Sequence, residues 1–130
     1  MRRTASAKLP PPREETEQIA LFTWAEFVQK QHPELALMHH IPNGGWRNPA
    51  EAAKFKRMGV KAGIPDIFLP LATKTSHGLY LELKRKTGGR LSEDQKAKIE
   101  LLRAAGYRVE ACKGFEEARK IIEGYLREER

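Results

Sequence analysis

The chain has 130 residues, of which 40% are hydrophobic and 32% charged, a composition typical of one soluble globular domain with a single core. Lys and Arg outnumber Asp and Glu by 24 to 17, and the formal charge of +7 favours a polyanionic partner. One cysteine, Cys112, excludes an internal disulfide, and the lack of a signal-peptide pattern or a bilayer-spanning apolar run argues against a membrane partner and predicts a cytoplasmic protein.

The chain opens with a basic, proline-rich segment, residues 1–13, which cannot bury a core. We expect a flexible tail there, either touching a polyanion or simply solvated, followed by one domain at 14–130. From Glu14 to about Lys30 the apolar spacing predicts a helix whose buried stripe begins with Glu14 and Glu17. These two acids either point into a cleft or simply complement the helix dipole.

Residues 32–33, His-Pro, end this helix, and residues 35–41 are typical of a short buried strand. In the loop that follows, the glycines allow close backbone approach, while Trp46 and Arg47 are suited to stack on or pair with nucleic acid. An ordinary turn explains the same loop equally well.

The rest of the chain contains two sequence signals for the start of a helix. Asn48 followed by proline predicts a helix that ends near Met58. Ser92 and Gln95 form a capping box that predicts a helix through Ala105. The remaining elements are strands at 66–69, 78–84 and 107–112, and a final helix from about residue 115.

The predicted order is α-β-α-β-β-α-β-α, an α/β fold with a mixed sheet flanked by helices. A hairpin is the economical connection between the strands at 66–69 and 78–84. The strand at 78–84, the helix at 93–105 and the strand at 107–112 should form a right-handed parallel crossover.

Two ionisable residues interrupt the strand at 78–84. Alternation places Tyr80, Glu82 and Lys84 on one face and leucines on the other. A strand covered by helices is ordinarily apolar, so the two charges require an explanation. One alternative is a surface ion pair between Glu82 and Lys84 on a half-exposed strand.

A hairpin centred near residue 74 sets Asp66 opposite Glu82. Two carboxylates roughly 5 Å apart repel each other unless a cation lies between them, and hard oxygen ligands suit Mg²⁺ or Mn²⁺. Lys84 would then stand beside the metal, placed to orient an attacking water or to neutralise charge on a phosphate. The sequence therefore predicts a metal-dependent phosphodiester-cleaving centre.

These residues also carry a resemblance. Gly63-Ile64-Pro65-Asp66 followed by Glu82-Leu83-Lys84 resembles the PD-(D/E)xK nuclease signature. Pro42-Asn43-Gly44-Gly45, the stretch from Lys56 to Asp66, Gly89-Arg90-Leu91-Ser92 with Gln95, and Ala105-Gly106-Tyr107-Arg108-Val109 are similar to the virus-type replication-repair nuclease (VRR-NUC) family. The resemblance runs from about residue 14 to residue 126.

The resemblance implies a restriction-endonuclease-like fold and metal-dependent cleavage of DNA. It implies that Asp66, Glu82, Lys84 and Gln95 are catalytic, although the capping box explains Gln95 equally well. It assigns the family's acidic residue on the first helix to Glu14, with Glu17 as the alternative, so that Asp66, Glu82 and Glu14 would hold the metal.

Small stand-alone members of the family, often viral, are similar to Holliday-junction resolvases and act as homodimers. The resemblance thus implies a homodimer that acts on branched DNA in a bacterial or phage-infected cell. Linear duplex or single strands remain alternative substrates, as does a role in DNA binding without cleavage. The residues expected to contact DNA are Asn43, Gly44, Trp46, Arg47, Lys54, Lys56, Arg57, Lys61, Arg85, Lys86 and Arg90.

Overall fold

A computed structural model describes residues 14–42 and 48–130, and the expectations for residues 1–13 and for Asn43, Gly44, Trp46 and Arg47 lie outside this part of the chain. The elements are α1 (Glu14–Phe27), a 3₁₀ turn η1 (Pro33–Leu37), β1 (His39–His40), α2 (Pro49–Arg57), β2 (Ile67–Leu69), β3 (Leu79–Lys84), α3 (Glu93–Ala104), β4 (Arg108–Lys113) and α4 (Gly114–Leu126). The predicted order of helices and strands is confirmed.

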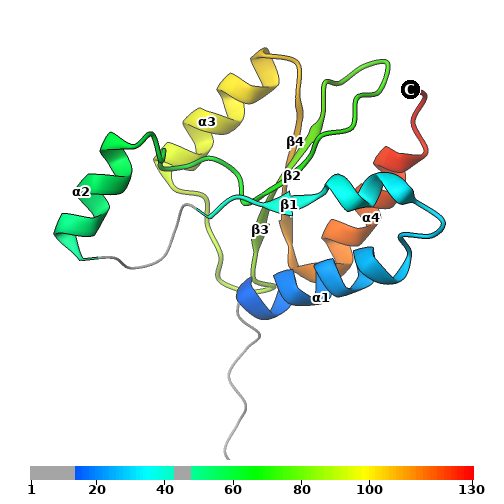
Figure 1. Ribbon diagram of the computed structural model, residues 1–130, viewed down its shortest axis with the longest axis horizontal. Helices are drawn as coiled ribbons and strands as arrows, with labels where there is room; N and C mark the ends of the chain where they lie inside the picture. Colours follow the sequence, from blue (N-terminus) through cyan, green and yellow to red (C-terminus); the bar gives the residue numbers. More distant parts are fainter. Residues whose placement is uncertain (1–13, 43–47) are drawn as a thin grey trace, which may run out of the picture.

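One sheet with the strand order β1-β2-β3-β4 forms the centre of the molecule (Figure 1). The pairs β1–β2 and β2–β3 are antiparallel, while β3 and β4 run parallel with α3 between them in the chain. The sheet is therefore mixed, and the predicted hairpin and parallel crossover are both present.

The core lies between one face of this sheet and the helices α1 and α4. It is built from the leucines of β3 together with Leu21 and Ala25 of α1 and Ile122 and Tyr125 of α4, all at most 4% exposed. The alternation predicted for β3 explains the arrangement, because every second residue of the strand enters this core. On the other face α3 packs against β4.

The expected strand at 35–41 is wrong in most of its length. Residues 33–37 form a 3₁₀ turn, and only His39 and His40 pair with β2. Pro33 favours the turn at its first position, and the buried side chains, Leu35 and Met38, are three residues apart, which is the 3₁₀ repeat. A period of three over so short an apolar run resembles a buried strand.

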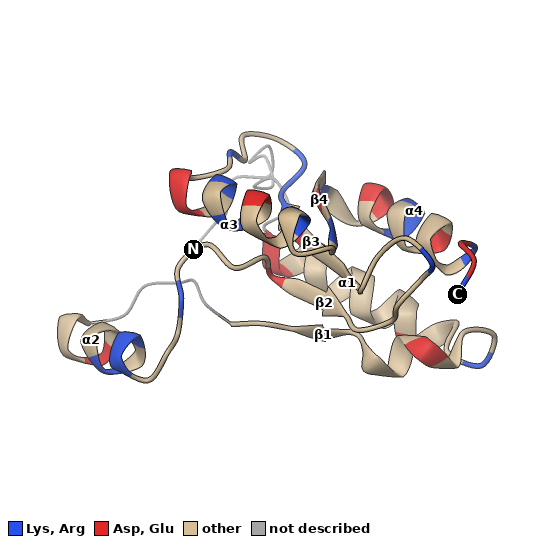
Figure 2. Cartoon of the chain, turned by 90° about the horizontal axis from the view of Figure 1, so that it is seen from above, with Lys and Arg blue, Asp and Glu red and all other residues tan. Residues whose placement is uncertain are grey.

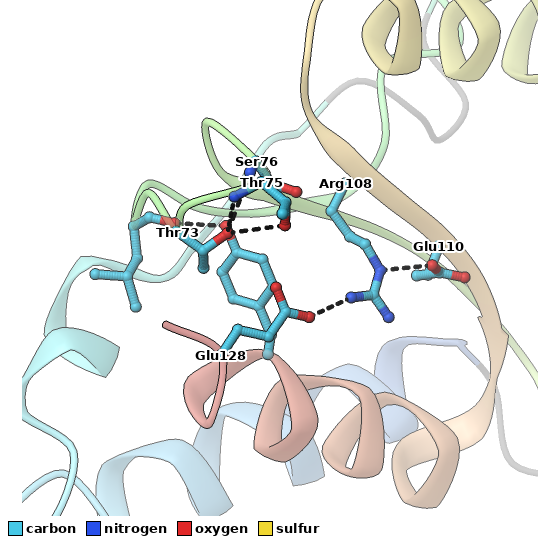
Figure 3. A network of polar contacts seen from close by, with 8 residues as sticks. Thr73, Thr75, Ser76, Arg108, Glu110 and Glu128 are labelled. Atoms are coloured by element: carbon cyan, nitrogen blue, oxygen red, sulfur yellow. Dashed lines mark hydrogen bonds and ion pairs between the residues drawn. The ribbon is translucent and has the colours of Figure 1, made fainter. Parts of the chain in front are cut away.

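The end of the sheet at the hairpin loop is closed by polar contacts (Figure 3). Thr73 Oγ1 accepts hydrogen bonds from the backbone N–H groups of Thr75 and Ser76, which closes the loop. Arg108 lies between Glu110 and Glu128 at 2.8 and 2.7 Å and ties β4 to the residues after α4. The β2–β3 register puts this network at the end of the hairpin remote from Asp66 and Glu82.

The helix α2 stands apart from the sheet and the other helices in both views (Figures 1 and 2). It has no buried residue, and Asn48 caps it by accepting a hydrogen bond from the Glu51 N–H at 2.8 Å. No helix of the described residues is long and apolar enough to cross a membrane.

Candidate active site

The predicted register between Asp66 and Glu82 is confirmed. Ile67 pairs with Leu81 and Leu69 with Leu79, so one further step along the hairpin sets Asp66 opposite Glu82. Asp66 Oδ2 accepts a hydrogen bond of 2.8 Å from the Leu83 N–H, which fixes the carboxylate across the start of the hairpin. The two carboxyl groups thus face each other at one end of the pair of strands.

Glu82 is the most deeply buried charged side chain among the described residues, with 1% of its surface exposed. Its Oε2 accepts a hydrogen bond from Gln95 Nε2 at 3.0 Å and lies 3.7 Å from Lys84 Nζ. Its Oε1 is buried and has no hydrogen-bond partner among the described residues. Since an unpaired buried carboxylate oxygen is costly, this atom is available for a ligand.

The electrostatics agree with this geometry. Burial, followed by the charge of Asp66, raises the pKa of Glu82 to about 8. Burial also raises the pKa of Asp66, against the hydrogen bond from the Leu83 N–H, and the charge of Glu14 acts in the same direction as burial. Without a cation the pair therefore holds a proton at neutral pH, which is the behaviour of two carboxyl groups that share a site.

The structure separates the two acids of the first helix. Glu17 is 5% exposed, and its Oε1 accepts a hydrogen bond from the Phe115 N–H at 2.7 Å. It thereby satisfies an unpaired donor at the start of α4. Glu14 is exposed and close enough to Asp66 and Glu82 to raise the pKa of both, so Glu14 is the better candidate for a third acid.

Lys84 is a partly buried lysine, with 14% of its side chain exposed, at the edge of a cleft of about 450 Å³. The cleft lies between the start of α1 and the loop after β3, and its lining residues are Glu14, Glu15, Lys84, Arg85, Gly88, Gly89 and Arg90. Glu15 lines this cleft together with Glu14. Lys84 is therefore not half of an exposed surface pair.

Gln95 completes the predicted capping box and also contacts Glu82. The Gln95 Oε1 accepts a hydrogen bond from the Ser92 backbone N–H at 2.8 Å, and the Gln95 backbone N–H donates to Ser92 Oγ at 3.1 Å. The capping box is therefore complete. The remaining Nε2 donates to Glu82. The helix cap thus holds the amide in the orientation that contacts the buried carboxylate.

Two glycines for which the sequence predicts no role bring these parts together. Gly63 has a φ of +89°, and a Cβ there would lie 2.5 Å from the Asp94 carbonyl oxygen, so the segment before Asp66 packs directly on the start of α3. A Cβ at Gly89 would lie 2.9 Å from Cβ of Lys84. The glycine shortly before Asp66 was the sequence signal for this packing, since glycine allows two backbone segments to approach closely.

Among the residues that the structure describes, those expected to bind DNA form two groups. Lys54, Lys56 and Arg57 lie in the last turn of α2, away from the sheet, and Lys61 is exposed shortly after it (Figure 2). Arg85 and Arg90 line the cleft beside Lys84, and Lys86 is exposed between them. The arginines of the second group share the cleft with Lys84 and Glu14.

The comparisons with known proteins decide the family. The model of the VRR-NUC domain matches residues 7–116. The chain belongs to the VRR-NUC family. A solved structure described as "VRR_NUC domain protein" is 33% identical, with a TM-score of 0.80 over 93% of each chain. A comparison with curated proteins gave no match.

The VRR-NUC assignment agrees with the expected fold. The mixed sheet, the flanking helices and the nuclease type of the domain are those that the motifs predicted. Within residues 14–42 and 48–130, no three His, Cys, Asp or Glu side chains are gathered as a formed metal site. The acidic constellation is a pair, Asp66 and Glu82, with Glu14 nearby.

Proposed function

We propose that this VRR-NUC protein is a DNA endonuclease that hydrolyses phosphodiester bonds with Mg²⁺ or Mn²⁺. The observation that carries the proposal is the opposed pair of Asp66 and Glu82. Within the described part of the chain, the buried Oε1 of Glu82 has no hydrogen-bond partner. A protein that only bound DNA would gain nothing from two carboxylates that repel phosphate. A bound divalent cation would explain the pair, because it would neutralise the negative charge of the two carboxylates.

The donor set fits a hard divalent cation. Asp66 and Glu82 would hold the metal, and Glu14 would add a third oxygen ligand. Bound there, the metal would lower the pKa of a water molecule and polarise the phosphate. Gln95 and the Leu83 N–H each hold one oxygen of a carboxylate, which leaves the other oxygen of each group for the cation.

Lys84 is the candidate for charge compensation at the reacting phosphate. Its Nζ lies 3.7 Å from Glu82 Oε2, on the edge of the cleft that Arg85 and Arg90 also line. An ammonium group at this place would orient the attacking water or neutralise negative charge that develops on the phosphate. The two arginines would hold the neighbouring phosphates.

We propose branched DNA such as a Holliday junction as the substrate and a homodimer as the active form. Symmetric cutting of a two-fold junction requires two active sites related by a two-fold axis, and C2 dimers are the commonest assemblies. The net charge of +7 favours duplex arms on either side of the branch.

A substrate panel tests this function. Purified protein with Mg²⁺ or Mn²⁺ should cut four-way junctions faster than flaps, linear duplex or single strands of the same sequence, and EDTA should stop all cutting. Light scattering at micromolar concentration should give twice the mass of the chain. Faster cutting of linear or single-stranded DNA by a monomer would refute the junction proposal, and DNA binding without any cutting would refute the enzyme.

The double role of Gln95 gives a second prediction. Ser92→Ala removes only the cap and should lower the melting temperature, at a cost of about 1 kcal/mol, with cleavage unchanged. Gln95→Ala also removes the contact to Glu82 and should lower cleavage or metal affinity about 10- to 100-fold. Melting curves and cleavage rates of the two variants measure this difference, and equal cleavage would reduce Gln95 to a helix cap.

A further inference from the structure

A row of aromatic side chains continues the face of the sheet that carries Asp66 and Glu82. Phe68 and Tyr80 stand directly opposite each other on β2 and β3, each two residues from one of the carboxylates. Their rings stack at 4.2 Å between centroids with an interplanar angle of 18°. Two residues along a strand span about 7 Å, so the rings lie beside the acidic pair.

The row extends across the sheet in both directions. His39 of β1 contacts the Phe68 ring edge-on at 5.8 Å, and Tyr107 contacts Phe68 and Tyr80 at 6.0 and 5.3 Å. His77 closes the row with a contact to Tyr107 at 5.7 Å. We call these five residues, His39, Phe68, His77, Tyr80 and Tyr107, the aromatic row.

Glycines seat two members of the aromatic row. A Cβ at Gly78 would lie 2.9 Å from the Phe68 ring, and a Cβ at Gly106, whose φ is +99°, would lie 2.5 Å from His77. The backbone is therefore shaped to hold these rings. Phe68 is nevertheless only half-buried, and His39 and His77 are exposed.

The chemistry of the row is that of a nucleobase contact and not of a core. The apolar core lies on the other side of the sheet, under α1 and α4. The row combines flat rings with polar edges, two imidazoles and two phenols, which suit stacking on bases and hydrogen bonding at their rims. A second copy seated permanently on the row would stand beside Asp66 and Glu82, where substrate has to enter.

We propose that the aromatic row is a binding site for unpaired nucleobases beside the point of cleavage. The inference rests on the proposed nuclease function and adds a contact for nucleotides that lose their pairing next to the scissile phosphate, as when base pairs open at the branch point of a junction. Bases inside a duplex are stacked on each other and cannot use the row. The bases of a single strand expose their flat faces and can stack on the row. This stacking on aromatic side chains needs no particular sequence.

The test measures binding in EDTA, so that no cutting is required. The probe is a 12-nucleotide single strand that contains 2-aminopurine, compared with the same strand in a duplex. The wild-type protein should quench the fluorescence of the single strand. His39→Ala, His77→Ala and Tyr80→Leu should each weaken single-strand binding about 5- to 100-fold, with the duplex affinity changed less than two-fold.

Two further variants control for folding and for nonspecific binding to exposed aromatic rings. Tyr80→Phe keeps the ring and should restore the binding lost in Tyr80→Leu. Phe27→Ala removes an aromatic ring that is 85% exposed on α1, and it should leave both affinities unchanged.

The possible outcomes distinguish the proposal for the aromatic row from the proposal of nuclease activity. Folded variants that bind single strands as the wild type does would overturn the row, as would equal losses for single strand and duplex. Dissociation of a dimer by these substitutions, with single-strand binding intact, would show a contact between copies instead and would also overturn it. Quenching by a protein that cuts no DNA would support the row and refute the proposed nuclease.

Discussion

Asp66→Asn should lower DNA cleavage by about 10³-fold while leaving the protein folded. The substitution keeps the side-chain volume, and an amide oxygen can still accept the hydrogen bond from the Leu83 N–H. It removes the negative charge of residue 66, so the repulsion between this residue and Glu82 falls when no metal is bound. The metal-free variant should therefore melt at the same temperature as the wild type or slightly higher.

The measurement combines cleavage with melting curves recorded with and without Mn²⁺. The cation should raise the melting temperature of the wild type and have little effect on Asp66→Asn, because a ligand that binds only the folded state stabilises it. DNA binding without metal should persist or tighten, since less negative charge faces the phosphates. A variant that cuts at close to the wild-type rate would exclude Asp66 from the site.

Asp94→Asn is a matched control, because Asp94 is the only other aspartate of the chain and lies exposed in the first turn of α3. It should leave both cleavage and the effect of Mn²⁺ unchanged. A similar loss in both variants would mean that the general charge of this region matters and that the specific pair does not.

Much of this site was predictable from the sequence, because period and register are local properties. The alternation of β3 fixed which residues share a face, and the position of the hairpin set Asp66 against Glu82. The cap at Ser92 was readable for the same reason, since its signal lies within four residues.

What the sequence left open depends on contacts between distant segments. Glu14 and Glu17 lie on the same helical stripe, and only the N-terminus of α4, 98 residues away, engages Glu17. The role of Gly63 requires the start of α3 to pack against it. The aromatic row was also hidden, because its members come from β1, β2, β3 and two loops, and only Tyr80 had been placed on this face.

The pKa of Glu82 leads to a prediction about stability and pH. In the metal-free fold this pKa is raised from its ordinary 4.5 to about 8, first by burial and then by Asp66. A carboxyl group with a raised pKa favours the fold in its neutral form. Its contribution to stability is therefore complete below pH 4.5 and is lost as the pH rises through about 8.

Glu82→Gln should abolish this loss, because the amide is neutral at every pH and can still accept a hydrogen bond from Gln95. In EDTA, the melting temperatures of wild type and variant should be similar near pH 4.5 and diverge upward, with the variant higher at pH 8 to 9. Mn²⁺ should reverse the order at high pH, since the cation stabilises the ionised pair of the wild type and finds one carboxylate fewer in the variant.

Melting curves in EDTA and in Mn²⁺ between pH 4.5 and 9 measure both effects, and Glu100→Gln, an exposed glutamate on α3, is the control that should follow the wild type. Parallel curves for wild type and Glu82→Gln in EDTA would mean that Glu82 is already ionised and compensated by Lys84. The carboxyl pair would then need no cation, and the metal site would have to be sought elsewhere.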